Sequence, residues 1–292
     1  MTNFKSNILG ALLAMSAVFS ASTFARADAP AGQYADINGL HMYYEVHGNG
    51  APLLLIHGGL CTIEVCFGPL IEKLQTSRQV IAVELQGHGH TADIDRPLRG
   101  DLLASDMSAL LKQLKIEKAD VLGYSIGADV AYELAKSNPA QVNKLITLSL
   151  LTSKAGGYPE MFQGTSAMKA DMFKGSPWLE AYNKTAPHPE DFQKLLDKIG
   201  GWSASFTDEP IESVKALKMP VMLIIGDSDM VRPEHAAELF RALGGGVFGD
   251  MTPMPAARLA VLPGTTHVGL ISRAGWIAEM VAEFLDARPP KK

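Results

Sequence analysis

Six segments of this chain are apolar almost throughout and stop at glycine or at polar residues. A strand that is apolar at successive positions has both faces buried, which is typical of a parallel sheet covered by helices. The segments are residues 52–59 (PLLLIHGG), 78–89 (RQVIAVELQGHG), 119–125 (ADVLGYS), 143–151 (NKLITLSLL), 219–229 (MPVMLIIGDSD) and 257–264 (ARLAVLPG). Apolar residues at helical spacing occur among them, at residues 101–114, 128–137, 233–243 and 274–287. This alternation predicts an α/β fold with a mostly parallel sheet flanked by helices.

Two further segments complete the predicted organisation. Residues 34–48 hold two strand-like runs on either side of Asn38-Gly39, a pair that tolerates the positive φ angles of a type I′ turn, so we expect a hairpin. Residues 152–218 lack a clear sheet strand and contain short helical patterns rich in Met, Phe and Trp. Insertions of this length are usually functional. We expect a helical lid at 152–218, inserted between a first core part at 28–151 and a second at 219–292.

The first residues are typical of a secretory signal peptide. Lys5 precedes an apolar run at residues 8–19, and Ala25-Arg26-Ala27 supplies the small-residue pattern of a cleavage site. The run is too short for a comfortable membrane span, so no stable span is expected after cleavage. We expect removal of residues 1–27 and a periplasmic or secreted protein. An uncleaved amphipathic N-terminus is the alternative.

Charge and cysteine content narrow the classes of partner. The chain has 292 residues, a net charge of −5 and scattered basic residues, which gives no indication of nucleic acid as a partner. Its two cysteines, Cys61 and Cys66, could pair in an oxidising compartment, but buried free thiols are the favoured interpretation. They lack the additional cysteines or paired histidines of a metal site, so no metal is expected. Nothing in the sequence sets the oligomeric state.

One serine lies where a strand gives way to a helix. Gly123-Tyr124-Ser125-Ile126-Gly127 follows an apolar run and precedes a helical pattern. G-x-S-x-G in that context is the pattern of a nucleophilic serine on a strained turn, where flanking side chains would clash and glycine is therefore needed. The helix that follows directs its N-terminus at the serine, and the Ile126 N–H is free to bind an oxyanion.

A serine hydroxyl is a poor nucleophile without a histidine base that is held by a carboxylate. After a turn of this kind, the acid and then the histidine follow in the chain. The downstream histidines are His188 in the insertion, His235 within a helix, where we expect it to be solvated, and His267 after a strand in LPGTTHVGL. Sites gather at the carboxyl ends of parallel strands, which favours His267.

The acid has three candidates. Asp227 and Asp229 both follow the strand in VMLIIGDSD, and each could instead serve only in a turn or a helix cap. Asp250 is a distant third, in the glycine- and proline-rich connection at residues 244–257.

The second oxyanion donor is expected in the loop after an early strand, where the glycines of LLLIHGGL let the backbone approach a substrate carbonyl. We assign the Gly59 N–H, with Leu60 as a neighbour that could substitute. His57 precedes this loop, and His88 and His90 lie in QGHGHT. All three are interpreted as structural supports, because the catalytic base belongs downstream.

With these motifs in this order, the sequence resembles the α/β-hydrolase superfamily. The resemblance runs from about Tyr34 to the end apart from the insertion, and it is carried by LLLIHGG, ELQGHGHT, GYSIGADVA, LIIGDSDMVRPEHA and LPGTTHVGL. In the family the acid is usually the aspartate of G-x-x-D after the sixth core strand, which here implies Asp229. The histidine of the family's last strand–helix loop matches His267. Serine at position 125 argues against the members with an aspartate nucleophile, such as haloalkane dehalogenases and epoxide hydrolases.

The expected activity is that of a serine hydrolase, foremost a carboxylesterase that cleaves small to medium esters without a cofactor. Candidate substrate-binding residues are Leu60, Tyr124, Met161, Phe162, Met172 and Trp178, although the apolar residues of the insertion could equally pack a core of their own. Two alternatives stay open. One is a C–C bond hydrolase or cofactor-free peroxidase with the same triad, and the other is a ligand-binding protein with vestigial turnover.

Overall fold

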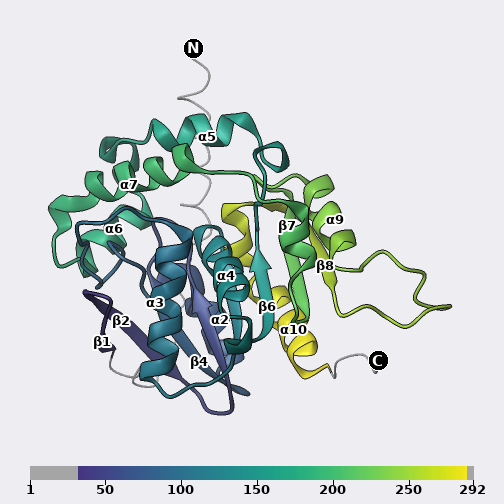
Figure 1. Cartoon of the computed structure of the whole chain (residues 1–292). Coiled ribbons are helices and arrows are strands. Elements are labelled where there is room, and N and C mark those ends of the chain that lie inside the picture. The colour runs from purple at the N-terminus through teal and green to yellow at the C-terminus, as the bar shows by residue number, and fades with distance from the viewer. Residues whose placement is uncertain (1–31, 288–292) are drawn as a thin grey trace.

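The computed structural model describes residues 32–287, so the signal peptide expected at residues 1–27 lies outside the described residues. Within that range, eight strands form one sheet in the order β1-β2-β4-β3-β5-β6-β7-β8 (Figure 1). The strands are β1 (Gln33–Ile37), β2 (Leu40–His47), β3 (Ala51–Ile56), β4 (Arg78–Val83), β5 (Ala119–Tyr124), β6 (Val142–Leu148), β7 (Val221–Ser228) and β8 (Arg258–Thr266). Strands β3 to β8 run parallel, and β1 and β2 add an antiparallel edge. The predicted mostly parallel α/β sheet is confirmed.

The antiparallel edge is the expected hairpin. Asn38 and Gly39 have φ angles of 50° and 83°, as a type I′ turn requires. Ile37 pairs with Leu40 directly across this turn.

Helices cover both faces of the sheet, which explains why its strands are apolar at successive positions. Leu54 and Ile56 of β3 point into the core under helices α3 and α4, while Leu53 and Leu55 point into the opposite core under α2 and α10. The α-helices are α2 (Ile63–Leu74), α3 (Gly100–Gln113), α4 (Ile126–Ser137), α5 (Pro159–Ser166), α6 (Pro177–Thr185), α7 (Phe192–Ser205), α8 (Ile211–Lys215), α9 (Pro233–Ala242) and α10 (Ala274–Asp286). Short 3-10 turns lie at η1 (Pro139–Gln141), η2 (Lys154–Gly156), η3 (Ala170–Phe173), η4 (Pro189–Asp191) and η5 (Val268–Arg273). No helix within residues 32–287 combines the length and apolar character needed to cross a membrane.

The chain between β6 and β7 is helical and contributes no strand to the described sheet. We call residues 152–218 the helical insertion. Its helices α5, α6 and α7 lie beyond one end of the sheet, across the carboxyl ends of the parallel strands (Figure 1). Because functional side chains gather at that end of such a sheet, the insertion is positioned to cover them.

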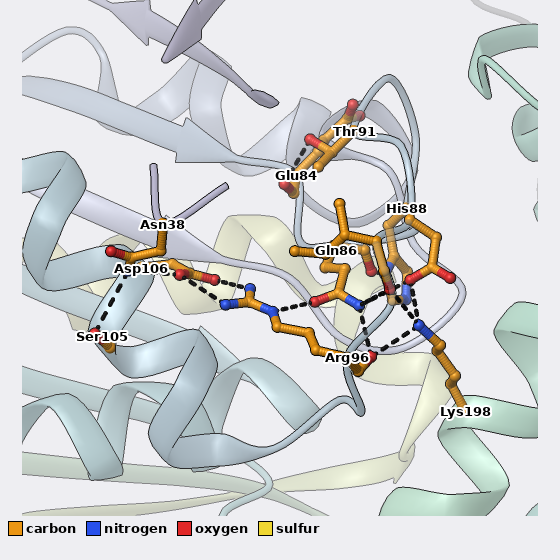
Figure 2. Close-up of polar contacts among 11 residues, drawn as sticks. Asn38, Glu84, Gln86, His88, Thr91, Arg96, Ser105, Asp106 and Lys198 are labelled. Atoms are coloured by element: carbon orange, nitrogen blue, oxygen red, sulfur yellow. Dashed lines mark hydrogen bonds and ion pairs between the residues drawn. The ribbon is translucent and has the colours of Figure 1, made fainter. Parts of the chain in front are cut away.

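A polar network ties helix α7 of the insertion to the loop after β4. The Lys198 ammonium donates to Asp93 Oδ1 at 2.6 Å and to two backbone oxygens, of Ile94 at 2.7 Å and of Arg96 at 2.8 Å. Figure 2 shows Lys198 pointing toward this loop, where Gln86 donates to the same three residues. Burial alone would raise the pKa of the Asp93 carboxyl. Hydrogen bonds from Lys194, Lys198 and Gln86 outweigh burial and lower that pKa.

Replacement of Lys198 by methionine is expected to lower the melting temperature. The substitution keeps the aliphatic part of the side chain but removes the ammonium group that donates to Asp93 and to two backbone carbonyls. We expect this to lower the free energy of unfolding by about 1–3 kcal/mol. For a domain of this size that corresponds to roughly 3–10 °C. Thermal unfolding followed by circular dichroism measures the shift, with Lys184→Met on the exposed surface of α6 as the matched control. Equal melting temperatures for the two variants would contradict a stabilising role for this network.

Cys61 and Cys66 form a disulfide, so the favoured prediction of free thiols was wrong. Cys61 precedes α2 and Cys66 lies in its first turns, with Cα atoms 5.8 Å apart and both side chains buried. The helix turns the second thiol back toward the first, and this distance lies in the normal range for a disulfide. Five residues of sequence separation could not reveal that geometry.

Candidate active site

Ser125 occupies the junction between β5 and α4 in a strained backbone conformation. Its φ and ψ angles are 55° and −122°, a region that side-chain-bearing residues rarely adopt. The turn is held by hydrogen bonds at both backbone groups of Ser125. Its N–H donates to Leu148 O at 2.9 Å, and its carbonyl accepts from Ala128 N at 2.7 Å and Asp129 N at 3.2 Å. Strain held this firmly is typical of a functional position.

The glycines on either side of Ser125 are required by close backbone contacts. A Cβ on Gly123 would lie 2.0 Å from the Gly127 carbonyl oxygen, and a Cβ on Gly127 would lie 2.0 Å from the Ile56 carbonyl oxygen. Neither oxygen can move away without displacing a strand or the start of α4. The two glycines of the G-x-S-x-G pattern are therefore needed because α4 packs closely against the sheet below the serine.

Gly127→Ala is expected to destabilise the fold by at least about 3 kcal/mol, because the added methyl group overlaps strand β3. Chemical denaturation measures the free energy of unfolding. Gly201→Ala in helix α7 is the matched control, since a Cβ there meets nothing within 4 Å. The control is expected to be neutral or stabilising by about 0.5–1 kcal/mol. Equal stability of the two variants would show that the contact is not constraining.

The structure brings the three candidate residues Ser125, His267 and Asp229 together, with the imidazole between the hydroxyl and the carboxylate. His267 Nε2 lies 3.0 Å from Ser125 Oγ, and His267 Nδ1 lies 2.9 Å from Asp229 Oδ1. The Asp229 side chain is completely buried, while that of His267 is 22% exposed. Burial alone would raise the pKa of Asp229, but hydrogen bonds and the charge of His267 outweigh it and lower the pKa below its usual value. A carboxylate therefore faces the imidazole.

Two other residues hold these side chains in place. Ser149 Oγ donates to Asp229 Oδ2, which also accepts from Gly226 N at 3.1 Å. The Tyr124 hydroxyl donates to the His267 carbonyl at 3.1 Å, and the two rings stack. Sequence reasoning missed Ser149, although a polar residue directly after an apolar strand at this end of the sheet is a usable signal.

The other candidate acids and histidines lie elsewhere. Asp227 accepts the N–H groups of Gly264 at 2.8 Å and Thr265 at 3.0 Å, so it fixes the strand end that precedes His267. Asp250 and His188 are exposed. His235 is buried, contrary to the prediction that it is solvated, because it packs beneath the start of the insertion and accepts the Thr152 N–H at 3.2 Å.

The loop that contains the predicted oxyanion donor Gly59 lies beside Ser125 and Ile126. A Cβ on Gly58 would lie 3.0 Å from Ser125 Cβ, and one on Gly59 would lie 3.0 Å from Ile126 Cδ1, so this loop touches the start of α4. Within residues 32–287, no hydrogen bond uses the N–H of Gly59 or of Ile126. Neither N–H group is therefore occupied by a described hydrogen bond.

His57 and His88 support the adjacent loops, as expected. His57 Nε2 accepts the Leu85 N–H at 3.1 Å, and His88 Nδ1 lies 3.0 Å from the Gln86 carbonyl. Burial lowers the pKa of His57 from 6.5 to about 3 and that of His88 to about 4. His90 lies 2.9 Å from Glu84 and is partly exposed.

These depressed pKa values predict acid destabilisation between pH 6.5 and about 4. In that window an unfolded histidine takes up a proton while buried His57 and His88 do not, so stability is complete above pH 6.5 and falls as pH decreases. The expected slope is about 1.4 kcal/mol per pH unit for each histidine. Chemical denaturation at pH 7, 6 and 5 measures it, and His88→Asn is expected to reduce the slope by about half. A constant free energy of unfolding would contradict neutral burial.

An apolar cavity of about 230 Å³ adjoins the serine. It is roofed by residues of the helical insertion, and three predicted residues, Leu60, Met161 and Phe162, line it. The other three predicted residues do not line the cavity. Tyr124 is buried in the core under α2 and α10. Trp178 is buried in the core under α3 and α4, against which Met172 also packs. Met168, another methionine of the insertion that the sequence suggested for a pocket, also lines it. Lining residues that sequence reasoning missed are Asp129, Ser149, Leu151, Thr165, Ile199, Trp202, Ser203, Phe206 and Met230. Most come from the insertion, whose docking cannot be read from local patterns.

Comparison with known proteins places this arrangement in a family. The family model described as alpha/beta hydrolase fold matches residues 51–180. The crystal structure of the enol-lactonase from Burkholderia xenovorans LB400 superposes with a TM-score of 0.68 at 20% identity, covering 87% of this chain and 100% of that one. This chain belongs to the α/β-hydrolase superfamily.

Two curated relatives of this α/β hydrolase extend the comparison. The AB hydrolase superfamily protein YisY of Bacillus subtilis is 27% identical over 228 residues, which cover 69% of this chain and 83% of the relative. The pimeloyl-[acyl-carrier protein] methyl ester esterase of Aliivibrio salmonicida is 32% identical over 108 residues, which cover 37% of this chain and 39% of the esterase.

Proposed function

We propose that this α/β hydrolase is a serine hydrolase that acts as a carboxylesterase on small to medium esters. The observation that carries the proposal is the continuous contact from Ser125 Oγ through the His267 imidazole to the buried Asp229 carboxylate, at 3.0 and 2.9 Å. A serine nucleophile needs a neutral imidazole that accepts its proton and a carboxylate that holds the opposite ring N–H. The same three groups can serve C–C bond hydrolysis, and the apolar cavity does not by itself select the bond.

In the proposed mechanism, His267 Nε2 accepts the Ser125 hydroxyl proton as Oγ attacks the ester carbonyl carbon. The resulting oxyanion accepts the N–H groups of Gly59 and Ile126, which are preorganised and need no rearrangement. The tetrahedral intermediate then collapses, and His267 delivers its proton to the departing alcohol. Asp229 stabilises the imidazolium that exists between these steps. A water molecule, deprotonated by His267, attacks the acyl-enzyme in the same way and releases the acid.

The cavity and one relative support an ester with an apolar acyl or alkyl group. The lining of the cavity that contains Ser125 includes the apolar residues Leu60, Met161, Phe162 and Met230. Its volume of about 230 Å³ fits a small or medium group. The methyl ester esterase that matches this chain over 108 residues also acts on an ester, as its name states. We further propose that the chain acts after export, which the Cys61–Cys66 disulfide supports because disulfides persist in oxidising compartments.

Hydrolysis of p-nitrophenyl esters from acetate to dodecanoate tests this function. We expect saturable release of p-nitrophenol with an optimum at short to medium acyl chains, because the roof over Ser125 limits the chain length. Vinylogous keto acids that fragment at a C–C bond are the comparison substrates. Turnover of those compounds with no ester hydrolysis would overturn the esterase proposal, and no turnover of either would overturn the hydrolase proposal.

A further inference from the structure

Asp129 introduces a carboxyl group into a cavity whose lining is mostly apolar. It lies one helical turn after Ser125 on α4 and lines the same cavity as the serine and His267. The lining of this cavity includes no lysine or arginine, and Asp129 is its single acidic residue. Across residues 32–287, no ion pair involves Asp129. The proposed ester mechanism gives this group no role.

Asp129 also marks the boundary with a second cavity. An outer cavity of about 410 Å³ shares Asp129, Leu151, Trp202 and Phe206 with the catalytic cavity. The outer cavity is lined by Asp101, Glu133 and Glu209 and by two basic residues, Arg99 and Lys136. Each of those two cations is already paired with these acids, Arg99 with Asp101 and Lys136 with Glu133 and Glu209. The acidic residues of the outer cavity therefore outnumber its basic residues, and neither cation is left to pair with Asp129.

The surroundings of Asp129 disfavour its negative charge in the free protein. Burial and then the nearby Glu133 raise the pKa of Asp129 well above its usual value. The Trp202 side chain and the Leu151 backbone oppose this shift only in part by hydrogen bonding to the carboxyl. A cation bound beside Asp129 would relieve that penalty and restore the carboxylate, whereas a substrate carboxylate would meet no positive partner in the cavity.

We propose that Asp129 selects substrates that carry a protonated amine, and that it binds the ammonium group where the two cavities meet. The apolar residues nearer Ser125 then hold the carbon chain between the ammonium and the scissile carbonyl. This inference rests on the proposed function, since it assigns a substrate class to the same site. Asp129 acts as a specificity residue, because it contacts the substrate but not the reacting atoms.

Competition between matched alkyl ligands tests the proposal. n-Butylammonium and n-hexylammonium ions are compared with 1-butanol and 1-hexanol as inhibitors of p-nitrophenyl acetate hydrolysis by the wild-type protein. A charged hydrogen bond to the carboxylate predicts inhibition constants at least about tenfold lower for the ammonium ions. Equal or weaker inhibition by the ammonium ions than by the alcohols would overturn the proposal without any variant.

Asp129→Asn separates substrate recognition from a purely structural role. Asparagine retains the shape and an acceptor for Trp202 and Leu151, but it cannot carry a negative charge. The preference for ammonium ions over alcohols is expected to fall to within about twofold in Asp129→Asn. Asp101→Asn removes the same charge from the outer cavity and is expected to keep the preference. An unchanged preference in Asp129→Asn would overturn the assignment.

Calorimetric titration of Ser125→Ala with n-hexylammonium and 1-hexanol keeps this inference distinct from the proposed function. The binding preference is measured there without turnover. If the wild-type protein hydrolyses no ester but Ser125→Ala prefers the ammonium ion, the hydrolase proposal fails and the cation site stands. If esters are hydrolysed but Ser125→Ala does not prefer the ammonium ion, the cation site fails and the hydrolase proposal stands.

Discussion

Ser125→Ala is expected to lower kcat for p-nitrophenyl butyrate by at least about 10⁴-fold, because it removes the nucleophile of the proposed acyl-enzyme pathway. The proposed oxyanion donors, the cavity and the His267–Asp229 pair remain, so residual activity above the uncatalysed rate is expected. The variant is expected to fold normally, since alanine is smaller than serine and the one described hydrogen bond of Ser125 Oγ is that with His267. Initial rates, with circular dichroism and melting temperature as folding checks, give the result.

Ser203→Ala is the matched control for the loss of a hydroxyl from the cavity. Ser203 lines the same cavity from helix α7 but makes no described contact with His267. Its kcat is expected to stay within a few fold of wild type, roughly the effect of altering one cavity wall. Activity retained in Ser125→Ala, or lost equally in both variants, would refute Ser125 as the nucleophile.

Asp229→Asn is expected to lower kcat by about 10³–10⁴-fold while leaving substrate binding nearly unchanged. Asp229 Oδ1 accepts the His267 Nδ1–H, and Oδ2 is fixed by Ser149 and Gly226. An amide in this place can present its NH₂ to Nδ1, which shifts the ring proton to Nε2 and blocks acceptance of the Ser125 proton. It also removes the negative charge that stabilises the imidazolium. Steady-state kinetics that separate kcat from KM measure both consequences.

Asp227→Asn provides the comparison for that result. Asp227 is a neighbouring, exposed carboxylate whose two acceptors hold the backbone of Gly264 and Thr265. One amide oxygen can keep part of this contact, so we expect a loss of about 1 kcal/mol in stability and less than tenfold in kcat. An active Asp229→Asn beside an inactive Asp227→Asn would show that Asp227, and not Asp229, is the acid of the triad.

Local patterns were sufficient for the parts of this molecule that short-range physics decides. Asn38-Gly39 predicted the hairpin because few other pairs accept two positive φ angles, and the structure confirms it. Apolar runs predicted a sheet covered on both faces, which the two helix layers confirm. Ser125, Asp229 and His267 follow the parallel strands β5, β7 and β8, and such strands end at one edge of the sheet, where the three side chains are in contact. Local patterns alone left Asp227 and Asp250 open as the acid, and the family resemblance selected Asp229.

Features set by packing between distant segments could not be predicted in the same way. His235 looks solvated on its own helix, yet the start of the insertion covers it. Trp178 looks like a pocket residue by composition, whereas Trp202 on α7 lines the cavity instead. Asp129 gave no sequence signal, because its environment depends on how the insertion closes over α4. The pairing of Cys61 with Cys66 depends likewise on the path of the loop before α2.

The most direct test of the central claim is covalent labelling of the wild-type protein with a fluorophosphonate, followed by peptide mapping by mass spectrometry. These reagents phosphonylate a serine that is activated by a neighbouring base. Our account predicts a single adduct on the peptide that contains Ser125, abolished in Ser125→Ala and strongly slowed in His267→Ala. An adduct at another serine, or labelling of Ser125 at the same rate without His267, would contradict it.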